Sequence, residues 1–348
     1  MKMLDLTSNS NPFGPSKRVR NALRKAIKKI NKDSSREKDL LIKYMAMKCG
    51  VEVKRIVFFS SLPLFLKAFF SEYSVRSVGL VAPVSKRLKN ILERVIASSK
   101  KEILVKAGSS LDDFSSGEPI DLLFLIYPHD VVGAKTSLLS RKLLDWALSE
   151  GVKIIIDETF LEFLESQEIR REYKLGEVTL VKSFSEFYGL SGLDLFCVCG
   201  GEEIVERLRP HLEVADASIL AYCAVRTALK DKKFRDRTLS LLREEKKYVI
   251  DKSKKAKTLI VEDTGSHILL IKSPHFAKID EILRRKGILV DTYLDQENVS
   301  YIRFPLKKRR TNALFIKTLL AIVEPFEKLP KKDSEPVRVD PSATHFVP

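Results

Sequence analysis

The chain has 348 residues, of which 44% are hydrophobic, and its formal net charge is +16. This composition excludes a chain that is disordered throughout, because it supplies enough apolar surface for one large globular unit or two closely packed domains. The most apolar stretch, residues 56–70, is interrupted by polar side chains and is shorter than the roughly 20 residues that cross a bilayer. The amino terminus lacks the apolar run of a signal peptide. We therefore expect a soluble, cytoplasmic protein without membrane contact.

The first helical pattern, residues 17–32, is strongly basic. It holds eight lysines and arginines and no acidic residue. Apolar residues recur in it at helical spacing, so the basic side chains are predicted to cover the solvated face of an amphipathic helix. A charged, glutamine-poor surface is typical of heat-adapted proteins, and the alternative of attraction to nucleic acid or another polyanion stays open. Further basic runs lie at 254–257 and 307–310, and the apolar positions of the helix are Val19, Leu23, Ala26, Ile27 and Ile30.

The four cysteines are few and unevenly spaced. The histidine nearest to Cys197 and Cys199, His211, has no partner at the spacing of metal ligands. We interpret all four, which include Cys49 and Cys223, as reduced thiols of the core.

From residue 35 to about residue 230, short apolar runs alternate with longer helical patterns. Such alternation predicts an α/β fold with a mostly parallel sheet that is flanked by helices on both faces. The predicted strands are 55–59, 78–81, 122–127, 153–156 and 179–182, and the clearest helices between them are 85–99 and 137–150.

Beyond residue 230 the pattern is that of a smaller α+β domain. It contains predicted helices at 234–254, 277–286 and 312–323 and predicted strands at 258–261, 267–271 and 301–304. The last stretch is rich in proline, serine and charge, which is typical of disorder. We therefore expect four parts, which are an N-terminal segment (1–34) that joins the small domain, a large domain (35–230), the small C-terminal domain (231–327) and a disordered tail (328–348).

Five short motifs occur between residues 5 and 325. They are LTSNSNPFGPS at 6–16, PHDVVG at 128–133, IIIDETFLEF at 154–163, SFSEFYGLSGLDLF at 183–196 and YIRF at 301–304. Their order and approximate spacing resemble the fold type I pyridoxal-phosphate aminotransferases, in particular the histidinol-phosphate aminotransferases and threonine-phosphate decarboxylases. The resemblance implies pyridoxal phosphate as the family cofactor and an amino-acid-like ligand. It also implies a homodimer, because the family builds its site across a two-fold interface.

The resemblance places Glu186 where the family has the lysine that forms an imine with the cofactor aldehyde. A carboxylate cannot form that imine, so we do not expect covalent attachment of the cofactor. Lys182, four residues earlier, stands where the family usually has arginine, and its amine reaches the site only if the end of the strand is reorganised.

Few of the family's other cofactor contacts are kept. Asp157 matches the aspartate that pairs with the pyridine nitrogen, and Ser183 matches a phosphate-binding serine. The arginine that clamps the phosphate corresponds to Asp194, which replaces attraction by repulsion. At the ring oxygen of the cofactor, Asp130 replaces an asparagine and Phe160 replaces a tyrosine. Ser85 stands where the family has the aromatic residue that stacks on the ring. In the phosphate loop, Phe59 and Leu62 replace small residues.

The implied substrate contacts are also mixed. Arg303 matches the arginine that grips the substrate carboxylate, and Asn11 lies in the first motif at a substrate-binding position. A second arginine of the phosphorylated-substrate site is replaced by Asp291.

These replacements, together with retained glycines and apolar strands, predict a degenerate aminotransferase-like protein whose fold has outlived its chemistry. Two alternatives stay open. One is an enzyme that holds pyridoxal or pyridoxamine phosphate non-covalently and uses Glu186 as a general base. The other is a basic nucleic-acid-binding or scaffold protein.

Overall fold

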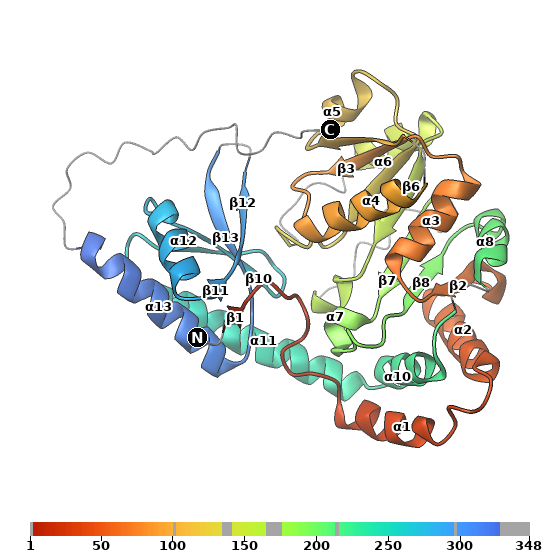
Figure 1. Cartoon of the computed structure of the whole chain (residues 1–348), viewed down its shortest axis with the longest axis horizontal. Coiled ribbons are helices and arrows are strands. Elements are labelled where there is room, and N and C mark those ends of the chain that lie inside the picture. The colour runs from red at the N-terminus through yellow and green to blue at the C-terminus, as the bar shows by residue number, and fades with distance from the viewer. Residues whose placement is uncertain are drawn as a thin grey trace.

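Two sheets organise the chain, one on each side of an N-terminal segment that runs between them (Figure 1). The computed structural model describes residues 3–99, 102–133, 141–164, 176–212, 216–295 and 298–327. The predicted tail (328–348) and residues 137–140 of a predicted helix lie outside these ranges.

The larger sheet has seven strands in the order β2-β8-β7-β6-β5-β3-β4. Every neighbouring pair from β7 to β4 is parallel, and only β8 runs antiparallel to its neighbours. The predicted α/β fold with a mostly parallel sheet is confirmed. The strands are β2 (Ile56–Phe59), β3 (Ser77–Val81), β4 (Leu104–Gly108), β5 (Leu122–Ile126), β6 (Lys153–Asp157), β7 (Thr179–Ser183) and β8 (Phe196–Cys199).

Successive side chains of these strands enter two different apolar layers, as the two-residue repeat of a strand requires. On β2, for example, Phe58 packs into one layer and Phe59 into the other, and both are fully buried. Helices α3 (Leu62–Glu72), α4 (Lys86–Ser99) and α8 (Glu202–Leu208) contribute to the layer of Phe59, and helices α2 (Ser35–Cys49), α6 (Arg141–Ser149) and α10 (Ile219–Leu229) to that of Phe58.

The smaller sheet is antiparallel, with the order β12-β13-β10-β9. Strand β9 starts two residues later than predicted. A separate two-stranded parallel pair joins β1 (Leu4–Asp5) to β11 (Ile288–Leu289), so the N-terminal segment is attached beside this sheet. The other elements are β9 (Ile260–Asp263), β10 (Ile268–Lys272), β12 (Asp291–Leu294), β13 (Ser300–Pro305), α11 (Lys232–Ser253), α12 (Phe276–Arg285) and α13 (Arg309–Glu327).

The basic segment forms α1 (Lys17–Ile27), which packs against α10. The Ser16 hydroxyl caps it by accepting a hydrogen bond from the Val19 amide. Val19 and Ala26 are buried, but the predicted apolar face is too long. Ile27 and Ile30 are 54% and 64% exposed, because the helix ends at Ile27 and the chain then turns.

Cys197, Cys199 and Cys223 are buried and form no disulfide with one another, as expected for core thiols, whereas Cys49 is partly exposed. Within the ranges given above, no helix is both long and apolar enough to span a membrane.

Candidate functional site

A pocket of about 340 Å³ lies between the two sheets, at the carboxyl ends of the central strands of the larger one. In open α/β sheets this edge is where ligands bind. Its walls come from the N-terminal segment, the first turn of α4, the loop after β5 and the residues after β7. Strands β12 and β13 of the smaller sheet complete them. The charged residues that line it are Lys86, Arg87, Asp130, Glu186, Asp291 and Arg303.

Glu186 lies on α7 (Ser185–Tyr188), a single helical turn that begins directly after β7. Its side chain lines the pocket and is 12% exposed. One carboxylate oxygen, Oε1, is 3.5 Å from Nη1 of Arg87, and the other, Oε2, accepts a hydrogen bond of 3.0 Å from the Ser10 hydroxyl. Ser10 also shares a 2.6 Å hydrogen bond with the Ser191 hydroxyl. The carboxylate is therefore anchored inside the pocket.

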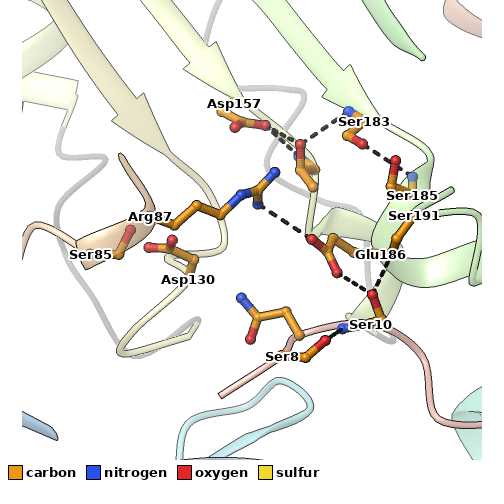
Figure 2. Close-up of polar contacts among 12 residues, drawn as sticks. Ser8, Ser10, Ser85, Arg87, Asp130, Asp157, Ser183, Ser185, Glu186 and Ser191 are labelled. Atoms are coloured by element: carbon orange, nitrogen blue, oxygen red, sulfur yellow. Dashed lines mark hydrogen bonds and ion pairs between the residues drawn. The ribbon is translucent and has the colours of Figure 1, made fainter. Parts of the chain in front are cut away.

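Arg87 crosses the pocket from the first turn of α4. Figure 2 shows its guanidinium between the carboxyl groups of Asp157, which ends β6, and Glu186, which lies on α7. Sequence reasoning singled out only its neighbour Ser85, which caps α4 by accepting from the Leu88 amide. The sequence signal that could have identified Arg87 is a basic pair, Lys86 and Arg87, at the start of a helix that follows the end of a strand.

Asp157 ends β6 and is almost fully buried. Its Oδ1 accepts hydrogen bonds from the Thr159 amide at 2.8 Å and the Thr159 hydroxyl at 2.5 Å. Burial raises the pKa of Asp157 to about 6, although the hydrogen bonds of Thr159 and the charge of Arg87 both act in the opposite direction. Between about pH 4 and pH 6 the folded protein therefore holds a proton on Asp157 that the unfolded chain releases.

Because that pKa is raised on folding, Asp157 destabilises the folded state once the pH rises above its unfolded value of 3.8, and the full cost is present above about 6. We expect Asp157→Asn to raise the free energy of unfolding at pH about 8 by up to about 3 kcal/mol, since asparagine still accepts both Thr159 hydrogen bonds. At pH about 4 the gain should vanish. Urea denaturation at the two pH values measures this, and an equal effect at both would contradict the buried-carboxyl assignment.

Two of the residues at the expected phosphate position, Ser183 and Asp194, are linked to each other through Ser185. The Ser183 hydroxyl accepts from the Ser185 amide at 3.1 Å, and the Ser185 hydroxyl donates to Oδ1 of Asp194 at 2.6 Å. Asp194 thus places a carboxylate, not a cation, beside these serines (Figure 2 shows Ser183 and Ser185). Phe59 and Leu62 are buried in the apolar layer of β2 and α3.

Arg303, on β13, is 4% exposed, and each of the three nitrogens of its guanidinium donates one hydrogen bond. Nε donates to the Asp130 carbonyl at 2.6 Å, Nη1 donates to the Thr7 carbonyl at 3.3 Å, and Nη2 donates to the Asn9 side chain. Asp291 lies 3.6 Å from Nη1. Burial lowers the pKa of Arg303. Arg303 lines the pocket, and a bound carboxylate would share its guanidinium with these partners.

Asp130 is 3% exposed, and among the described residues its buried Oδ1 has no hydrogen-bond partner. This oxygen lies 3.6 Å from Nδ1 of His129, but that nitrogen already accepts from the Val131 amide. Burial lowers the pKa of His129, so the ring is held neutral and does not balance the carboxylate. Asp130 therefore gives the pocket a polar group that its own fold leaves unsatisfied.

Asp157, Ser183 and Asp194 do not line the pocket, and three further residues of the predicted site lie outside its lining as well. The Asn11 amide donates to the Phe187 carbonyl at 2.7 Å, and Asn9, two residues earlier, lines the pocket instead. Phe160 is buried and stacks on the His267 ring. The Lys182 amine is buried 2.7 Å from Oε1 of Glu162, which directs it into an internal ion pair.

Comparison with known proteins places the fold. No family model matches the chain. In sequence, "Histidinol-phosphate aminotransferase 2" of Archaeoglobus fulgidus is 25% identical over 326 residues, which covers 92% of this chain and 93% of the relative.

Two solved structures have the same fold. Histidinol-phosphate aminotransferase from Sinorhizobium meliloti in complex with pyridoxal-5'-phosphate has a TM-score of 0.76, with 14% identity, and covers 93% of this chain and 92% of that one. L-threonine-O-3-phosphate decarboxylase from Porphyromonas gingivalis has a TM-score of 0.66, with 15% identity, and covers 92% of this chain and 100% of that one. The chain thus has the fold type I aminotransferase fold, and its relatives in sequence are histidinol-phosphate aminotransferases.

Proposed function

We propose that this chain, a homologue of the histidinol-phosphate aminotransferases, has kept their fold and given up transamination, so that its pocket now binds rather than converts a small ligand. The observation that carries the proposal is the position of Glu186. Its carboxylate lies in the pocket, held by Arg87 and Ser10, at the place that the motif SFSEFYGLSG assigns to the imine-forming lysine.

Pyridoxal phosphate does not fit the residues present. Asp157 is available for the pyridine nitrogen, but Arg87 extends through the space between Asp157 and Glu186 (Figure 2). At the position expected for the cofactor phosphate, the Asp194 carboxylate accepts a hydrogen bond from Ser185 and would repel the phosphate. Formation of the cofactor imine by Lys182 is disfavoured as well, because the Lys182 amine pairs with the buried Glu162.

The proposal includes the wider organisation of the protein. Residues 35–230 and 231–327 form a large and a small domain, and the segment 1–34 is joined to the small one through the pairing of β1 with β11. By analogy with the family, the chain acts as a homodimer in the cytoplasm.

A second candidate is an enzyme that holds pyridoxamine phosphate without a covalent bond and uses Glu186 as a general base. The observation that favours it is Asp157, which is retained at the end of β6 close to Arg87, although it does not line the pocket (Figure 2). Arg87 and Asp194 count against it, because either side chain would have to move before the cofactor could enter.

Isothermal titration calorimetry with pyridoxal phosphate and, separately, with pyridoxamine phosphate distinguishes the two candidates. The pseudoenzyme predicts no binding of either compound at micromolar concentrations. Binding of pyridoxamine phosphate that is lost in Asp157→Asn would favour the lysine-independent enzyme, because only a cofactor ring needs that carboxyl group. Asp145→Asn, at an exposed position on α6, is the matched control.

A further inference from the structure

A second and larger hollow lies between the start of α1 and the start of α11. Its volume is about 720 Å³. We call it the basic groove, because six cations line it and its one acidic residue, Asp231, accepts from the Phe234 amide as the cap of α11. The six are Lys17, Arg18, Arg20, Lys233, Arg237 and Lys308.

The positive charges of these six residues are hardly neutralised by acidic neighbours. Arg18 donates to the Lys230 carbonyl and Arg20 to the Pro15 carbonyl, and in the described part of the chain none of the six makes an ion pair. Arg309, next to Lys308 in the sequence, differs from these six, because it pairs with Glu245 at 2.9 Å. The basic groove is therefore a local concentration of unpaired positive charge.

Two aromatic side chains complete the walls. Phe13 and Phe234 are partly buried and line the basic groove together with the cations. The positive charge also continues beyond the groove along α1, where Arg24, Lys25 and Lys28 are exposed. The helix of 11 residues is about 16 Å long. The backbone of a linear anion that enters the groove can therefore run along the helix for a length of several phosphate groups.

We propose that the basic groove and the exposed face of α1 bind single-stranded nucleic acid. Cations that follow a phosphate backbone, beside aromatic rings that stack on unpaired bases, are the arrangement that single strands require. A duplex hides its base faces from such rings, and a compact anion does not use the length of α1. This binding is separate from the pocket at Glu186 and does not depend on what that pocket holds.

The test is fluorescence anisotropy of the full-length protein with a labelled oligothymidine, over a range of salt concentrations. Wild-type protein should bind, and log K should fall with log salt with a slope of about −0.7 for each phosphate contacted. The combined variant Lys17→Glu, Arg20→Glu, Arg237→Glu should bind at least about tenfold more weakly and with a shallower slope. The matched control, Lys255→Glu, Lys286→Glu, Lys317→Glu, makes the same change of net charge at exposed positions outside the groove and should keep the wild-type affinity.

Stacking is tested by Phe234→Leu, which should weaken oligothymidine binding about tenfold and leave binding of heparin, a polyanion without bases, unchanged. Circular dichroism establishes that each variant is folded. The proposal is overturned by no binding at low salt, by an equal loss in the groove variant and the control, or by equal effects of Phe234→Leu on the two ligands.

Discussion

Replacing Glu162 with glutamine is expected to lower the free energy of unfolding by about 3 kcal/mol. Glu162 lies in a short 3₁₀ turn (Leu161–Phe163), is 2% exposed in its side chain and holds three cations. Its Oε1 is 2.7 Å from the Lys182 amine and 3.3 Å from the Lys48 amine, and its Oε2 is 3.1 Å from Nε of Arg235. The substitution leaves Lys182 buried without a counter-ion. The other two cations are about a quarter exposed and regain water, which keeps the effect at the lower end for buried pairs.

The effect should also depend on pH. Burial raises the pKa of Glu162, but the charges of Lys182, Lys48 and Arg235 overcome this and hold it well below its usual value. Because the folded-state pKa is depressed, the stability that Glu162 contributes is complete above about 4.5 and is lost as the pH falls further. Wild type and Glu162→Gln should therefore approach each other in acid.

Urea denaturation of both proteins between neutral pH and pH about 3 measures this. Glu203→Gln is the control, because Glu203 forms an exposed ion pair with Arg207 on α8 and should cost within about 0.5 kcal/mol. If Glu162→Gln costs no more than this control at neutral pH, the buried network is not a stabilising contact between β7, α2 and α11.

Replacing Gly189 with alanine is expected to cost about 3 kcal/mol or more. Gly189 ends α7 with a φ of +64°, and an added Cβ would lie 2.7 Å from the carbonyl carbon of Gly14 and 2.9 Å from its Cα. Those atoms belong to the backbone and cannot rotate away. The clash would push apart α7, which carries Glu186, and the N-terminal segment, which carries Ser10.

Gly50 gives a matched control for this substitution. It ends α2 with a φ of +67°, and nothing lies within 4 Å of an added Cβ. Gly50→Ala therefore reports the conformational penalty alone, about 1 kcal/mol. Denaturation midpoints of the two variants measure the difference, and equal losses would mean that Gly189 is not crowded by the N-terminal segment.

The central strands of the larger sheet could be predicted because each is a continuous apolar run that is buried on both faces. Strand β4 could not, because it lies at the edge of the sheet and Leu104 and Ala107 are exposed, which breaks the run. Strand β8 was not predicted either, although FCVC is short, apolar and fully buried. Strand β8 runs antiparallel to its neighbours. The alternation of strands with helices predicts parallel strands, so it does not indicate β8.

The resemblance brings only some of the charged positions together, since Asp130, Glu186, Asp291 and Arg303 line one pocket but Asp157 and Asp194 do not. The motifs do not report how far a side chain reaches. Arg87 enters the pocket from α4, and Asn9 rather than Asn11 faces Arg303, because the direction of each side chain is set by packing between segments far apart in the sequence.

The most direct test of the lost imine is reductive trapping. The protein is incubated with pyridoxal phosphate, reduced with borohydride and mapped by peptide mass spectrometry, with a lysine-containing aminotransferase as the positive control. We predict no stoichiometric label on any single lysine, and in particular none on Lys182, whose amine is held by Glu162. Stoichiometric labelling of Lys182 would show that this chain still forms the cofactor imine, and would contradict the proposal that it has given up transamination.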